Sequence, residues 1–135
     1  MTLNKKRRQI LRRRQFTGVN LSGRDMSGAK LSGRSFENAV LRNAILRNAD
    51  LQYSTFVNAD LRFVDFTNSD LTGANFAGAD LRGADLRGAK RKGANLNGAN
   101  LNGAKTSNNK KRRSRFKEAR IGESKSAIRN DTKEL

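Results

Sequence analysis

The feature that most constrains this chain is a five-residue repeat through its middle. Counting in fives from Phe16 to Leu101 gives eighteen central positions, and all except Arg91 hold a large apolar residue. Two residues after the central position stands Gly or Asn in sixteen of the eighteen cases, the exceptions being Tyr53 and Phe63. A period of five suits neither a helix nor a strand, whose periods are about 3.6 and 2. Because Gly and Asn favour turns, the chain is expected to turn once every five residues.

The central residues and the small residues two positions before them are expected to point inward. Four turns then close a square coil, and coils stack by main-chain pairing about 4.8 Å apart. Stacking makes the core continuous, so two inward residues in five suffice and the low apolar content of 35% does not indicate disorder here. The predicted core contains Leu41, Leu46, Leu51, Phe56, Leu61, Phe66, Leu71, Phe76, Leu81, Leu86, Leu96 and Leu101.

The repeat resembles the pentapeptide-repeat family, whose consensus is Ala-(Asp/Asn)-Leu-X-X. Matching stretches are Ala-Asp-Leu-Arg at 59–62, Ala-Asp-Leu-Arg-Gly at 79–83 and 84–88, and Ala-Asn-Leu-Asn-Gly at 94–98. The resemblance covers roughly residues 14–103 and implies an all-β solenoid, a right-handed quadrilateral β-helix of about four and a half coils. We therefore expect a basic N-terminal extension or cap at 1–15, the β-helix at 16–103, and a basic C-terminal tail at 104–135 that is compatible with partly helical structure.

Four arginines depart from the repeat. Arg14, Arg24 and Arg34 stand where the family has a small residue, and Arg91 stands at a central position. Burial of an unpartnered charge is costly, so the first coil is expected either to distort or to release its arginines at the open end. At Arg91 either the side chain reaches outward or the coil bulges.

The net charge of +17 is concentrated in the two ends of the chain. Residues 1–15 contribute +7, residues 16–103 contribute +3, and residues 104–135 contribute +7. Dense basic blocks bind phosphates without reading a sequence, and no known DNA- or RNA-reading motif accompanies them. We expect a non-enzymatic scaffold that docks on nucleic acid or a nucleoprotein through Lys5, Lys6, Arg7, Arg8, Arg12, Arg13, Arg14, Lys110, Lys111, Arg112, Arg113, Arg115 and Lys117.

Other functions of the tails remain open. They would also serve a structural adaptor that contacts acidic protein or anionic lipid in a protein or membrane-associated complex, or they would simply keep the chain soluble. Some members of the family imitate DNA through an acidic rod and bind topoisomerase, but a rod of +3 has the opposite sign. Nothing in the sequence supports a dimer.

The predicted rod surface offers two further candidate sites. Residues twenty apart should stack, which puts Arg42, Arg62 and Arg82 in one column and Arg47 and Arg87 on the neighbouring side. These arginines either track phosphates or pair with the aspartates nearby, namely Asp60, Asp80 and Asp85. Tyr53 and Phe63 are expected to be partly exposed and are candidates for a protein contact.

Composition excludes several kinds of chemistry. The chain has no His and no Cys, so it has no Ser-His triad, thiolate metal site or disulfide. Stacked aspartates could offer oxygen ligands, but the adjacent arginines disfavour a cation, and a filled β-helix leaves no substrate pocket. We therefore expect no catalytic residue, cofactor or metal. No apolar run reaches the roughly 18 residues of a membrane span and no secretory signal is visible, so we expect a cytoplasmic protein.

Overall fold

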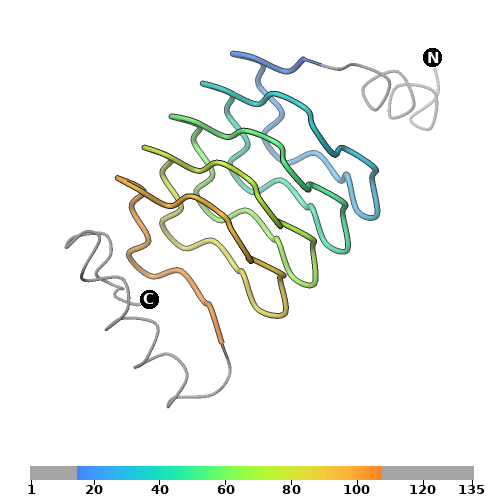
Figure 1. The fold of residues 1–135 in the computed structure, drawn as a ribbon. Helices are drawn as coiled ribbons and strands as arrows, with labels where there is room; N and C mark the ends of the chain where they lie inside the picture. Colours follow the sequence, from blue (N-terminus) through green and yellow to red (C-terminus); the bar gives the residue numbers. More distant parts are fainter. Residues whose placement is uncertain (1–14, 108–135) are drawn as a thin grey trace.

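The computed structural model describes residues 15–107, which form a stack of square coils (Figure 1). All fifteen main-chain bridges join a residue to the one twenty positions later in parallel, from Gln15 with Ser35 to Asp85 with Lys105. Between residues 15 and 107 there is no helix and no strand longer than a single bridged residue. At twenty residues per coil this part of the chain makes about four and a half coils, as predicted.

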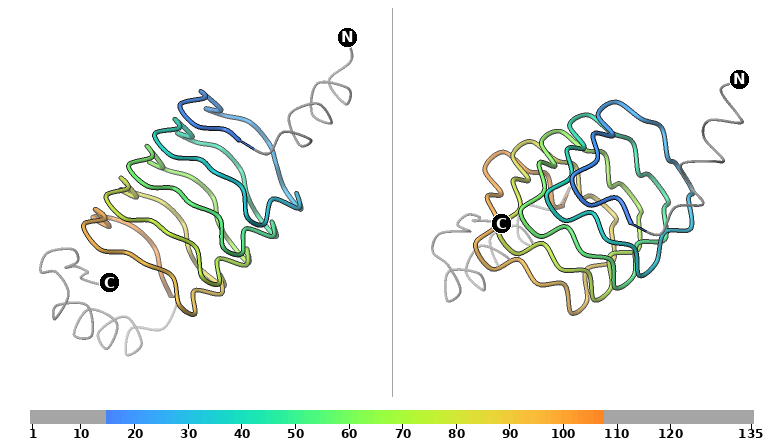
Figure 2. Two further views of the ribbon diagram at one scale, coloured as in Figure 1. Left: turned by 45° about the horizontal axis from the view of Figure 1, so that its top comes forward. Right: turned by 90° about the horizontal axis from the view of Figure 1, so that it is seen from above.

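Each side of a coil consists of a bridged residue, a central residue, two turn residues and a small residue. We name the four sides by their first central residues: the Phe16 side, the Leu21 side, the Met26 side and the Leu31 side. Figure 2 shows the four-sided coils from two further directions, with the blue first coil and the orange last coil at opposite ends of the rod.

Every turn has the same hydrogen bond and the same backbone conformation. The amide of the small residue donates to the carbonyl of the central residue, as from Ala39 to Phe36 at 3.0 Å. The second turn residue has a positive φ at all eighteen positions, between 58° at Asn38 and 76° at Gly103. A type II turn requires this left-handed conformation at its third residue. The regular Gly and Asn are therefore explained by the left-handed backbone of the turn, which these residues adopt at the lowest cost.

The predicted core is confirmed for eleven of its twelve residues, which are at most 5% exposed. The rings of Phe36, Phe56 and Phe76 stack with centroids 4.8 and 5.0 Å apart, and the Phe66 ring meets Phe56 edge-on at 5.8 Å. Leu96 is the exception, because it is only partly buried.

The first coil is not distorted, so that alternative is wrong. Arg24 and Arg34 keep the standard turn, since their amides donate to Leu21 and Leu31 at 3.1 and 3.2 Å. The Arg24 side chain is exposed, whereas that of Arg34 is half-buried and its Nε has no hydrogen-bond partner. The backbone therefore keeps its register, and only the side chains depart from the family pattern. Arg14 lies outside the described residues.

The coil does not bulge at Arg91 either. The amide of Ala94 donates to the Arg91 carbonyl at 3.0 Å, and the bridges of Lys90 to Asp70 and of Asn95 to Asn75 keep the twenty-residue register. The Arg91 side chain is half-buried at the end of the Leu31, Leu51 and Leu71 column. Of the two alternatives, the bulge is wrong.

Candidate binding surfaces

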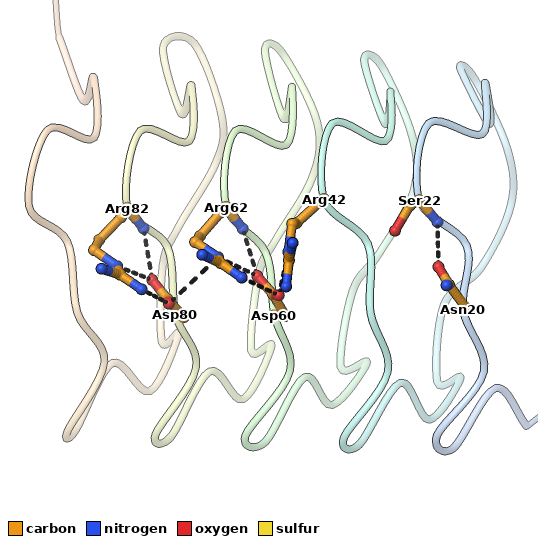
Figure 3. A network of polar contacts seen from close by, with 7 residues as sticks. All are labelled: Asn20, Ser22, Arg42, Asp60, Arg62, Asp80 and Arg82. Atoms are coloured by element: carbon orange, nitrogen blue, oxygen red, sulfur yellow. Dashed lines mark hydrogen bonds and ion pairs between the residues drawn. The ribbon is translucent and has the colours of Figure 1, made fainter.

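The arginines of the Leu21 side form a continuous network with two aspartates (Figure 3). Asp60 Oδ2 accepts from Arg42 Nε at 2.6 Å and from Arg62 Nη2 at 2.8 Å. Asp80 accepts from Arg82 Nε at 2.8 Å and Nη2 at 2.6 Å, and its Oδ2 lies 3.7 Å from Arg62 Nε. Charges of alternating sign thus follow one another along the rod, with bonds within coils and between them.

The Met26 side carries the same kinds of residue. Arg87 donates from Nε and Nη2 to Asp85 at 2.9 and 2.6 Å, and Arg47 Nε lies 3.5 Å from Asp65 Oδ2. All five arginines of the predicted ladder therefore stand in the predicted columns, and each is next to a carboxylate. Of the two interpretations of the ladder, the geometry shows the ion-paired one.

The aspartates have a second, local role that sequence reasoning missed. The carboxylate of Asp65 accepts the amide of Thr67 at 2.9 Å, and the side-chain oxygen of Asn75 accepts the amide of Ala77 at 3.0 Å. Asp or Asn directly before the central residue thus holds the first turn residue in place. The recurrence of these two residue types at that position was the available signal.

The arginines keep the carboxylates ionised. The hydrogen bond from Arg62 holds the pKa of Asp60 far below its usual range, against the opposing effect of burial. Burial raises the pKa of Asp80, but the bonds from Arg82 outweigh this effect and the pKa is lowered overall. The bond from Arg87 likewise lowers the pKa of Asp85. The five arginines and four aspartates of the two sides therefore nearly neutralise one another.

Tyr53 and Phe63 are the large apolar side chains that the described rod exposes, at 69% and 60%. Both have a left-handed backbone, with φ of 59° and 61°. The Phe63 ring lies over the same corner of the next coil, since a Cβ on Gly83 would come within 2.5 Å of its Cε1, and the Tyr53 ring covers Gly73 in the same way. The two residues occupy diagonally opposite corners, so they form two separate contact points.

Three further expectations from the sequence concern a metal site, a membrane span and the basic residues of the tails. No group of three or more Asp or Glu side chains in this part of the chain could hold a metal ion. No helix among the described residues is long and apolar enough to span a membrane. The thirteen basic residues predicted to bind a polyanion all lie in 1–14 and 108–135, outside the described residues.

Comparison with known proteins agrees with this architecture. A family model described as pentapeptide repeats matches eight copies over residues 15–50, 25–62 and 65–103. The structure of HetL, a pentapeptide repeat protein involved in heterocyst differentiation regulation from the cyanobacterium Nostoc sp. strain PCC 7120, matches with 26% identity and a TM-score of 0.71. The match covers 79% of this chain and 48% of HetL, so the chain spans about half of HetL's length.

A second solved structure shows the fold alone. It is the pentapeptide repeat protein Rfr23 from the cyanobacterium Cyanothece 51142, with 23% identity, a TM-score of 0.57, and coverage of 78% of this chain and 98% of Rfr23. No curated protein matches the sequence. The square coil of twenty residues is thus the right-handed quadrilateral β-helix that the resemblance implied, and this chain belongs to the pentapeptide-repeat family.

Proposed function

We propose that this chain is a non-enzymatic scaffold that binds a partner protein through Tyr53 and Phe63. The observation that carries the proposal is that both are exposed and both occupy left-handed turn positions. This conformation costs a residue other than Gly about 1–2 kcal/mol, so folding alone would favour Gly or Asn. Departures from a local rule that lower stability are typical of functional sites, and aromatic residues often anchor interfaces.

The rest of the rod supports a binding role. Stacked Leu and Phe side chains fill the coil interior, which leaves no space there for a substrate. Main-chain bonds to both neighbouring coils hold each corner in place, so the two aromatic residues are presented on a rigid frame. HetL, whose described role is regulation, has the same frame.

Replacing both aromatic residues by asparagine, in the variant Y53N/F63N, is expected to stabilise the rod. Asn tolerates the left-handed conformation better, and seven turns of the described chain have a residue other than Gly at this position, five of them Asn. We expect the free energy of unfolding to rise by about 1 kcal/mol, which is a rise in Tm of about 4–8 °C for a rod of this size. Thermal denaturation followed by circular dichroism measures it.

The same variant is expected to lose the partner. Full-length chain is used to capture proteins from a nuclease-treated extract of the source organism, and each protein retained is purified and its affinity measured. Two lost anchors should weaken binding by about 100-fold, at about 1.4 kcal/mol for each tenfold. The matched control is N43G/N48G, which changes two corners without aromatic residues. A protein that binds the wild type and Y53N/F63N equally would contradict the proposal.

A second candidate function is docking on nucleic acid through the tails, which is favoured by their share of the charge: fourteen of the seventeen excess positive charges. In a full-length chain with the thirteen tail cations changed to Gln, binding to a 20-base-pair duplex DNA should be lost at 0.15 M salt. Binding that persists unchanged, or that is directed only to phosphatidylserine vesicles, would contradict this function.

A further inference from the structure

The cations of the described rod fall into two groups according to their neighbours. The five arginines of the middle coils lie within 4 Å of a carboxylate, as shown above. Six other cations form no ion pair with a residue of 15–107, and they are Arg24, Lys30 and Arg34 in the first coil and Lys90, Lys92 and Lys105 in the last turns. Residues 86–107 contain no Asp or Glu at all. Positive charge therefore remains unbalanced at the C-terminal end of the rod.

Three residues of this end break the local rules of the repeat. Lys90 and Lys105 stand where Asp or Asn in most other turns accepts the amide of the first turn residue, and an ammonium group cannot accept a hydrogen bond. Lys30, Val40 and Ile45 lack this acceptor too, but they lie in the first two coils. Their neighbours in the repeat, Asn95 and Asn100, make that bond at 2.9 and 3.0 Å. Arg91 replaces a core leucine. Each change gives up a stabilising interaction for a positive charge, which points to function.

The backbone places the lysines of this end on two neighbouring sides of the rod. The bridge with Asp70 puts Lys90 on the Leu31 side, and the bridge with Asp85 puts Lys105 on the Met26 side. Both aspartates have nearer partners, since Asp70 accepts from Thr72 at 2.6 Å and Asp85 from Arg87 at 2.6 Å. Lys90, Lys92 and Lys105 are exposed and form no ion pair within 4 Å with a residue of 15–107, although the charges of Lys90 and Lys105 contribute to the lowered pKa of Asp70 and Asp85.

We propose that Lys90, Lys92 and Lys105 form a phosphate-binding surface for nucleic acid at the C-terminal end of the rod. Ser107 ends the described part of the chain, and the basic block that begins at Lys110 follows three residues later, so the surface is continuous in sequence with that block. Phosphate contact by lysine needs only an exposed point charge and releases counterions. Nucleic acid then crosses this end of the rod, coloured orange in Figure 1, and does not follow the ion-paired Arg42, Arg62 and Arg82 column. The protein-binding function of Tyr53 and Phe63 is independent of this surface.

The test measures how the affinity of full-length chain for a 20-base-pair duplex DNA depends on salt. The slope of log K against log salt falls by about 0.9 for each phosphate contact that is lost. The variant K90Q/K92Q/K105Q should therefore bind with a slope shallower by about 2–3. The matched control is R42Q/R82Q/R87Q, which removes the same charge from the ion-paired columns and should change the slope by less than about 0.5. Circular dichroism melts check that both variants are folded.

Each other outcome overturns the proposal in a recognisable way. Equal loss of slope in the two variants would mean that net charge alone matters. A wild-type slope in K90Q/K92Q/K105Q, together with loss of binding when the tail cations are neutralised, would leave the tails as the whole binding site. If the wild-type chain does not bind DNA, both this surface and the docking function of the tails are wrong.

Discussion

Replacing Phe56 by alanine is expected to lower the free energy of unfolding by about 3–5 kcal/mol, the largest effect of any change considered for this protein. The Phe56 ring is fully buried, stacks between Phe36 and Phe76 at 4.8 and 5.0 Å, and meets Phe66 at its edge. Main-chain hydrogen bonds between successive coils hold the four sides in place. The coil therefore cannot contract around the cavity that the missing Phe56 ring would leave. The total free energy of unfolding of a small domain is only about 5–15 kcal/mol, so this loss is a large part of it.

Urea denaturation of the full-length chain measures this loss as a lower transition midpoint. The control is Phe63→Ala, which removes the same ring from a position that is 60% exposed and should cost less than about 1 kcal/mol. Similar losses in the two variants would show that the stacked rings do not dominate the stability of the rod.

Lowering the pH from 7 to 3 is expected to destabilise the rod by about 2–4 kcal/mol. Hydrogen bonds from arginine lower the pKa of Asp60, Asp80 and Asp85 in the folded chain. A lowered pKa in the folded state contributes stability that is complete above the unfolded pKa of about 4 and is lost as the pH falls toward the folded pKa. The loss should therefore begin near pH 4 and continue below pH 3. Protonation also adds to a charge that is already +17.

The variant D60N/D80N/D85N isolates the contribution of the three charges. Asn still accepts the amide of the turn, as Asn75 and Asn95 do, but it does not titrate. We expect the variant to be about 1–3 kcal/mol less stable at pH 7 and to lose less on acidification than the wild type. Denaturant titrations at pH 7, 5, 4 and 3 provide the comparison. An identical pH dependence in the two proteins would assign acid sensitivity to general charge repulsion.

Much of the fold could be predicted because its rule is local. A Gly or Asn two residues after each Leu or Phe requires a turn in every five residues, and repetition of that turn determines both the square coil and the inward columns. The prediction was less specific where the rule is broken. At Arg24, Arg34 and Arg91 the sequence left open whether the coil or only the side chain departs from the pattern, and the structure shows a regular turn hydrogen bond at all three positions.

The candidate site was less accessible from sequence because its contacts join coils. The pair of Arg62 with Asp60 is two residues apart and was one of the alternatives, whereas Arg42 reaches Asp60 across eighteen residues. The position of a side chain in a column does not say whether its charge is already balanced. The distinction between paired arginines in the middle and unbalanced lysines at the C-terminal end therefore came from distances.

The sequence by itself determined the period, the turn at every fifth residue, the identity of the core and the accumulation of positive charge in the tails. These properties depend on residue type and on spacing within one coil. The tertiary structure decided which charges neutralise one another and over which glycines the exposed aromatic rings lie. Such properties arise where residues twenty positions apart come within about 5 Å of each other in neighbouring coils. The sequence pattern predicts which residues lie in one column, but it does not predict which side chains of neighbouring coils contact one another.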